Sequence, residues 1–283
     1  MSAATIAPRP TALPPAKGRA GFGGAFASEW TKLRSVRSTM WIVLILIVTT
    51  VGISALGSHG QANNLPSPGV GPNGKVIQGY IQNARDLQFG IILGQLVIVV
   101  LGAIGIASEY STGMIRTSLT VQPRRGTVYL AKLLVLTLVT LVVSEVISFA
   151  SFFIGQSFFS AQGVHFSLSD TATLMAIIGG GGYLTGCALL AFGFGALFRN
   201  TAAGIAVPVA LLLVLALIVN DALPDSWQVH VDRFVPMTAG FQMWSTVHQP
   251  GQDLSGWNGF GVFMIYVIGA LVAGFWSFTK RDA

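Results

Sequence analysis

Six long apolar stretches alternate with polar connections along this chain, and no other feature limits its fold as strongly. A helix needs about 20 residues, each rising about 1.5 Å, to cross the roughly 30 Å hydrocarbon layer of a membrane. We therefore predict an all-α membrane protein with six transmembrane helices. The first stretch is short, and Trp41 is expected to anchor it at the membrane interface. The predicted spans cover residues 40–56, 89–107, 130–156, 174–197, 202–219 and 260–278.

The charged residues are few, and their distribution predicts an orientation. Only 9% of the residues are charged, against about 25% in soluble domains, which excludes that class. Thirteen of the sixteen Lys and Arg residues fall in the terminal segments and the second and fourth connections, whereas Lys75, Arg85 and Arg233 lie in the others. By the positive-inside rule both termini are cytoplasmic. The net charge of +6 thus reflects orientation and attraction to anionic lipid rather than nucleic-acid binding.

The segment before the first span divides into two parts. Residues 1–25 are rich in Pro, Ala and Gly without apolar periodicity, which predicts a disordered cytoplasmic tail. From residue 26 onward, Phe26, Trp30, Leu33 and Arg37 fall on one stripe of a helix. This pattern favours an amphipathic helix lying flat in the headgroup region. The alternative is that the stripe is only the frayed start of the first span.

The second connection contains a short helical pattern followed by a Pro-Arg-Arg-Gly turn at residues 123–126. Glu109, Arg116, Arg124 and Arg125 lie in it between two rigid spans, close to the membrane. Such a segment is suited to docking on another protein and passing a force to both spans. Equally, these residues alone are consistent with a solvated loop that carries positive-inside charges.

Glu145 is the ionisable residue predicted to lie deepest in a span. A carboxylate in hydrocarbon costs roughly 2.5 kcal/mol or more, so its side chain is expected to face protein or a water-filled cavity. It is either a wall of a substrate pathway or a structural partner in a hydrogen bond to a neighbouring polar group, and the sequence leaves both interpretations open.

The last exterior connection, residues 220–256, is too apolar for a solvated loop and is interrupted by Pro224, Pro236 and Pro250. Irregular backbone at membrane depth is tolerated only where protein or a water-filled cavity satisfies its polar groups. The segment is therefore predicted to be neither a solvated loop nor a further span.

Catalytic and metal sites are not predicted. Residues 69–75 fit the first seven positions of a phosphate-binding loop, but Val76 replaces the hydroxyl residue that would hold Mg²⁺, and no strand precedes the loop. The four histidines are scattered, and Cys187 is the only cysteine. The chain is therefore not expected to hydrolyse ATP or to bind a cofactor itself.

Five sequence blocks resemble a known family, and they occur in that family's order among the spans. The chain is similar to the ABC-2 type permeases, the membrane subunits of bacterial ABC exporters, and in particular to their actinobacterial branch. The resemblance covers residues 26–283. The blocks are SEWTKLRS at 28–35, EYSTGMIR at 109–116, PRRG at 123–126, GALFRNTAAG at 195–204 and FVPMTAG at 234–240.

The resemblance implies a division of labour. Two permease subunits, identical or related, would form the pathway, and two separate cytoplasmic ATPase subunits would bind ATP and Mg²⁺. The flat N-terminal helix and a coupling helix over residues 109–119 would contact the ATPases. Within the coupling helix the expected contacts are charged at Glu109 and Arg116, apolar at Tyr110 and Ile115, and a close approach or bend at Gly113.

The resemblance also implies re-entrant helices that cap the outer pathway before the last span, with Pro236 and Gly240 as candidates for an outer gate. The alternative is an interfacial lid without a gating role. Export of an amphiphilic or hydrophobic substrate is the expected activity. The alternative is an ATP-independent carrier or channel, although such proteins carry several ionisable residues within their spans or an internal repeat. An intramembrane hydrolase would need a buried base, whereas every histidine lies in an exterior connection.

Overall fold

The computed structural model describes residues 21–63, 84–115, 120, 124–161, 163–246 and 254–280. Across this described part the chain is helical, without a β-strand, and six helices are long and apolar enough to cross a membrane. The prediction of an all-α, six-span membrane protein is therefore confirmed. Residues 1–20 of the expected tail, the loop resembling a phosphate site and Arg116 lie outside the described residues.

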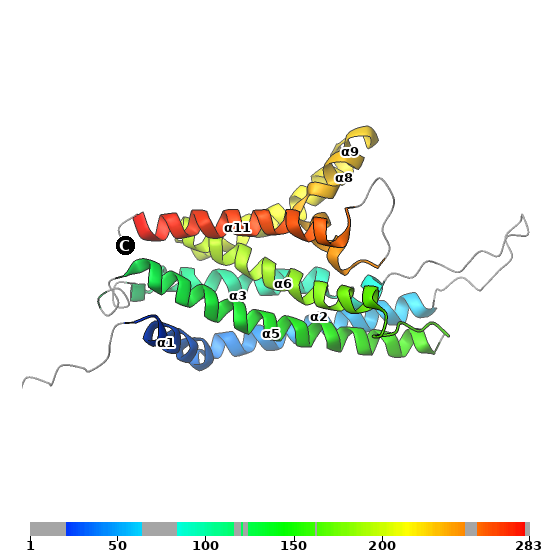
Figure 1. Cartoon of the computed structure of the whole chain (residues 1–283), viewed down its shortest axis with the longest axis horizontal. Coiled ribbons are helices and arrows are strands. Elements are labelled where there is room, and N and C mark those ends of the chain that lie inside the picture. The colour runs from blue at the N-terminus through cyan, green and yellow to red at the C-terminus, as the bar shows by residue number, and fades with distance from the viewer. Residues whose placement is uncertain are drawn as a thin grey trace, which may run out of the picture.

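The long helices run along the axis of the bundle, and α2, α3, α5 and α6 alternate in direction (Figure 1). In chain order the elements are α1 (Phe22–Ser35), α2 (Arg37–Asn63), the 3₁₀ turn η1 (Ala84–Gln88), α3 (Ile91–Ser111), α5 (Arg125–Ser160), α6 (Thr171–Phe198), α7 (Thr201–Val209), the π-helical turn η2 (Ala210–Val214), α8 (Leu215–Ala222), α9 (Asp225–Val231), the 3₁₀ turn η3 (Asp232–Phe234), α10 (Pro236–Phe241), the 3₁₀ turn η4 (Gln242–Trp244) and α11 (Gly256–Lys280).

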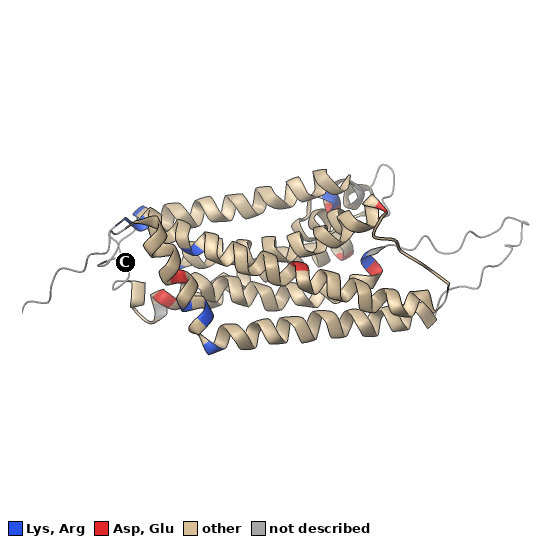
Figure 2. Cartoon of the chain, turned by 60° about the horizontal axis from the view of Figure 1, so that its bottom comes forward, with Lys and Arg blue, Asp and Glu red and all other residues tan. Residues whose placement is uncertain are grey.

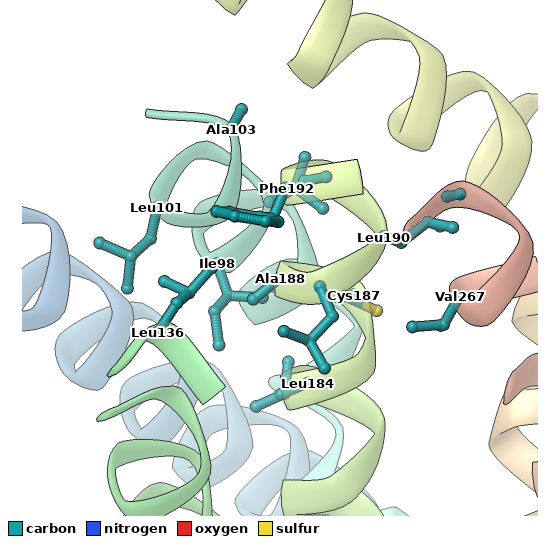
Figure 3. Packing of buried hydrophobic residues seen from close by; sticks show 14 of the residues in the cluster. Ile98, Leu101, Ala103, Leu136, Leu184, Cys187, Ala188, Leu190, Phe192 and Val267 are labelled. Atoms are coloured by element: carbon teal, nitrogen blue, oxygen red, sulfur yellow. The ribbon is translucent and has the colours of Figure 1, made fainter. Parts of the chain in front are cut away.

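Helix α6 forms the centre of the bundle. In its most apolar stretch 78% of the residues are buried, against 17% in α2. It packs on α3, α5, α7 and α11, and small side chains make this possible: Cys187 and Ala188 lie among Ile98, Leu136 and Val267 of three neighbouring helices (Figure 3). A Cβ atom added at Gly193 would lie 2.6 Å from the backbone carbon of Ala270, so these helices approach closely, as small residues permit in membranes.

The two ends of the bundle differ in the elements they carry. Helix α1, the start of α5 and the end of α11 lie at one end, which we call the α1 end (Figure 1). The short helices between α8 and α11 lie toward the opposite end. Lys, Arg, Asp and Glu residues gather toward these two ends and are sparse between them (Figure 2), as expected for helices whose middle lies in hydrocarbon.

Several helix bounds differ from the predicted ones. The first long helix extends beyond the predicted span of residues 40–56 on both sides, since α2 runs from Arg37 to Asn63. Helix α1 begins at Phe22, inside the expected tail, and ends at Ser35, because Val36 is extended. Arg37 consequently belongs to α2 and not to the amphipathic helix on which it was predicted.

The fifth span changes course along its length. Its first part, α7, packs on α6 and α3. Pro208 lies inside that helix and the π-helical turn η2 follows it; both features commonly bend helices. Beyond this point α8 and α9 project away from the bundle (Figure 1). The chain then returns through η3, α10 and η4, which contact α6 and α11, so short helices do occupy the connection where they were predicted.

Candidate functional site

Four charged side chains meet at the α1 end, where α1, α3 and α5 come together. Glu29 and Lys32 belong to α1, Glu109 to the last turn of α3 and Lys132 to the beginning of α5. We call these four residues the charge cluster. The Lys132 Nζ lies 2.6 Å from Glu29 Oε2 and 2.5 Å from Glu109 Oε1. The Lys32 Nζ lies 2.9 Å from Glu29 Oε1 and 3.0 Å from Glu109 Oε1.

Three members of the cluster are buried, the Lys32 side chain is 33% exposed, and the four charges balance. Lys132 is 4%, Glu109 5% and Glu29 9% exposed. Each ammonium contacts both carboxylates, so two negative and two positive charges cancel within one site. Removing charges from water is costly, and the cost is recovered only when every charge has partners in good geometry. We therefore expect the cluster to hold α1 to the spans only while all four members are present.

The pKa of Lys32 reflects this arrangement. Burial acts to lower it, but hydrogen bonds to Glu29 and Glu109 and the negative charges of both carboxylates outweigh burial and raise the pKa above its ordinary value. A raised pKa means that the stabilising contribution is complete below the ordinary lysine pKa of about 10.4 and is lost only as the pH rises through the higher folded-state value. Lys32 therefore stays protonated throughout the neutral range.

A cavity of about 330 Å³ adjoins the charge cluster. All four charged residues line it, together with the polar residues Ser35, Thr39 and Ser108. The rest of its lining is mostly apolar and comes from α1, the break at Val36, α3 and α5; it includes Leu33, Val36, Leu101, Ile104, Val135 and Leu136. The α1 end thus contains a space lined by both charged and apolar side chains.

The sequence analysis missed the cluster, although one signal pointed to it. Lys132 lies two residues inside the predicted third span, where a charge needs a counter-ion, yet it was counted only as a basic residue of the connection. Glu29 stood out only as a member of the block SEWTKLRS at residues 28–35. Glu29 and Lys132 are in contact although they lie 103 positions apart in the sequence. The periodicity of apolar residues cannot predict a contact over such a sequence separation.

The predicted coupling residues fall into two groups. Glu109 and Tyr110 extend α3 rather than opening a separate helix. Glu109 lies in the charge cluster, Ile115 is only 3% exposed in the core, and the half-buried Tyr110 ring makes an edge contact with Phe278. By contrast, Gly113 is exposed, with a φ of 70° that favours glycine, and Met114 is 47% exposed. Contact of these residues with an ATPase remains a prediction.

The predicted interfacial residues of α1 lie as follows. Phe26 and Trp30 stack with their ring centroids 6.4 Å apart, and Trp30 is 42% exposed. Leu33 is partly buried and packs on the core. Phe26 and Leu33 are thus partly buried and Trp30 is exposed, and the interfacial position of this helix remains a prediction.

Glu145 lies on α5 against α6. A Cβ atom added at Gly181 would be 2.5 Å from the carboxyl carbon of Glu145, so this side chain fills the space that the glycine leaves. Its Oε2 atom is buried and has no hydrogen-bond partner among the described residues. The expected structural hydrogen bond is thus not seen at that atom, and the substrate-pathway role remains a prediction.

The candidate gate residues lie in a tightly packed region at the opposite end. Pro236 and Gly240 are buried in α10. A Cβ atom at Gly240 would lie 2.5 Å from two carbons of the Tyr183 ring. The Tyr183 ring packs with three other aromatic rings, and the centroids of the paired rings lie 5.0 to 6.4 Å apart. We call these four residues the aromatic cluster: Tyr183, Phe241, Trp244 and Phe263. The Tyr183 hydroxyl also donates a hydrogen bond to Gln95 Oε1 on α3.

The chain matches a known protein family. The model of the ABC-2 family transporter proteins matches residues 25–219. The matched region runs from α1 into α8, and it includes the charge cluster and Glu145. No curated protein matches the chain.

Proposed function

The chain belongs to the ABC-2 family of transporter proteins and is a multi-pass membrane permease, and we propose that it couples ATP hydrolysis on separate subunits to export of an amphiphilic or hydrophobic substrate. In this proposal two permease chains form the pathway and two cytoplasmic ATPase subunits bind ATP and Mg²⁺. Both termini, and hence the α1 end, lie in the cytoplasm. The observation that carries the proposal is the charge cluster, because it joins three helices at that end.

The coupling step begins at the exposed residues that follow α3. Gly113 and Met114 offer surface to an ATPase, while Glu109, one turn earlier, is inside the charge cluster. When the ATPases close and move this segment, Glu109 moves with α3. Separating Glu109 from the two lysines would leave buried charges without partners, which is strongly unfavourable. Helices α1 and α5 are therefore expected to follow α3 as one unit.

The movement would reach the opposite end through α5 and α6. ATP acts by binding more tightly to the closed arrangement of the ATPases, which shifts the permease from inward-facing to outward-facing states. Glu145, where α5 contacts α6, is the proposed wall of the substrate pathway. Pro236 and Gly240 are the proposed outer gate, since α10 packs directly on Tyr183 of α6.

A substitution at the exposed segment tests the coupling step. Gly113→Trp should leave the permease folded in the membrane but reduce capture of the ATPase that co-purifies with the wild-type chain, together with substrate-stimulated ATP hydrolysis. Gly163→Trp is a matched control, because this glycine also has a positive φ, of 80°, and open space around it. Glu109→Arg is a poorer test than Gly113→Trp, since it would disrupt the charge cluster directly.

Equal capture and equal ATPase activity for the two tryptophan variants would contradict a docking role of the Gly113 segment.

The alternative of an ATP-independent carrier or channel predicts a different transport result. Proteoliposomes that contain the permease without any ATPase would then transport substrate at an undiminished rate, and such a result would replace the proposal.

Orientation can be tested by cysteine labelling. Cys187 is buried, so labelling of the native chain by an impermeant maleimide should be low. Lys280→Cys should then react only from the cytoplasmic side, and Ser169→Cys, in the connection between α5 and α6, only from the exterior. The opposite pattern would invert the proposed topology and remove the ATPase from the α1 end.

A further inference from the structure

A second, smaller cavity lies on the outer flank of α1, where α1, α2 and α5 meet. This groove has a volume of about 260 Å³. Its lining is mostly apolar, with Arg34 of α1 and Thr39 of α2 as the polar members; the apolar members are Trp30, Leu33, Met40, Val43, Val139 and Val143. Cavities that enclose a drug-sized ligand usually measure about 300–1,000 Å³, so this groove suits one hydrocarbon chain better than a whole compact ligand.

The basic residues beside the groove differ from those of the charge cluster. Lys32 and Lys132 are neutralised by two carboxylates. Arg34 and Arg37, on either side of the break at Val36, are exposed and form no ion pair with any described residue. An excess of positive charge therefore remains at the corner between α1 and α2.

The groove adjoins surface that a bilayer would cover. Met40 and Trp41 on α2 are 62% and 63% exposed, and Val142 on α5 is 63% exposed. In a membrane-spanning chain such apolar surface faces lipid tails, while exposed Trp30 stands where amphipathic rings usually meet headgroups. An occupant would thus need an apolar chain at the depth of Val43 and Val143 and an anionic group at the level of Arg34.

We propose that this groove binds one anionic phospholipid, with its phosphate at Arg34 and one acyl chain between Val43 of α2 and Val139 and Val143 of α5. Basic pockets between membrane helices are suited to such headgroups, and an excess of basic residues attracts anionic lipid. The bound lipid would fill the space between α1 and the spans and so support the position of α1. The inference needs neither the ATPase nor the exported substrate, and it goes beyond the proposed transport function.

The test is lipid binding to the purified chain, without an ATPase, by native mass spectrometry. Phosphatidylglycerol and phosphatidylcholine with identical acyl chains are titrated separately. The wild-type chain should bind phosphatidylglycerol about fivefold more tightly than phosphatidylcholine. This is the attraction to anionic lipid that one arginine near the membrane surface supplies. Arg34→Gln should abolish this preference, and Val139→Trp, which fills the groove, should weaken binding of both lipids.

Arg124→Gln is the matched control, because Arg124 is also exposed at the α1 end but does not line the groove; it should keep the preference. Equal binding of the two lipids by the wild-type chain would overturn the proposal. So would a preference that survives Arg34→Gln, or one that is lost to the same extent in Arg124→Gln. Undiminished binding by folded Val139→Trp would place the acyl chain outside the groove and would also refute the site.

Discussion

The two ends of the bundle attach a short segment to the spans by different means. At the α1 end, α1 is tied to α3 and α5 by two carboxylates and two ammonium groups at 2.5 to 3.0 Å. At the other end, α10 and η4 are held to α6 and α11 by the aromatic cluster and by close contact at Gly240. One attachment depends on charge balance and the other on shape.

This difference predicts different responses to substitution. Ionic groups in a buried cluster are interdependent, because removing one leaves the others desolvated and unbalanced. Ring packing and dispersion are spread over many atom pairs, so each change there removes a graded share. The α1 end is therefore expected to move as one unit or to come apart, whereas the α10 end can loosen by degrees, which suits a coupling device and a gate respectively.

The largest expected effect is at Lys132. Lys132→Met leaves Glu29 and Glu109 with a single, partly exposed lysine, and breaking a buried ion pair in this way costs about 3–5 kcal/mol. Unfolding measured by SDS titration in mixed micelles should show this loss. Lys280→Met, an exposed lysine at the same end, should be close to wild type.

A double variant tests whether the four charges act together. Lys132→Met combined with Glu109→Leu removes one charge of each sign and keeps the Glu29–Lys32 pair on α1. It should recover most of the stability that Lys132→Met loses, since an apolar replacement of a buried pair is often neutral. Additive losses in the double variant would show instead that the cluster is a set of independent contacts, and the comparison between the two ends would fail.

A smaller loss is expected at the α10 end. Gly240→Ala places a methyl group 2.5 Å from the ring of Tyr183, which is completely buried. Overpacking of this kind typically costs about 1–3 kcal/mol. Gly261→Ala on α11 is the control, because nothing lies within 4 Å of the added carbon; it should be neutral or slightly stabilising. If both alanine variants have the same free energy of unfolding, close packing against Tyr183 does not hold α10 in place.

The six spans were predictable because a lipid environment demands a long apolar stretch from each helix. Their limits were less predictable. Helix α2 continues through Ser58 and His59 to Asn63, since polar residues can extend a helix beyond the apolar stretch that signals it.

The two clusters show why tertiary contacts were harder to foresee. Lys132 and Glu109 were visible as charges near predicted span ends, but their meeting with Glu29 depends on how α1 folds back on the bundle. Tyr183 and Trp244 had no distinguishing mark, because a ring in an apolar segment looks the same whether it faces lipid or another ring. Gly240 was identified through the family resemblance alone, and its packing on Tyr183 supplies the physical reason for a glycine there.

Glu145 lies between the two ends and belongs to neither kind of attachment, so its substitution should have the smallest effect on stability. Its Oε2 has no hydrogen-bond partner among the described residues, so removing that oxygen leaves no partner group unsatisfied. Glu145→Gln and Glu145→Leu should therefore each change the free energy of unfolding by less than about 1 kcal/mol. If Glu145 lines the pathway, the same variants should nevertheless alter the rate of transport or the preference among substrates in proteoliposomes that contain the ATPase. Wild-type transport by both variants would remove Glu145 from the pathway, and a large loss of stability in the leucine variant alone would reveal a polar partner and return the residue to a structural role.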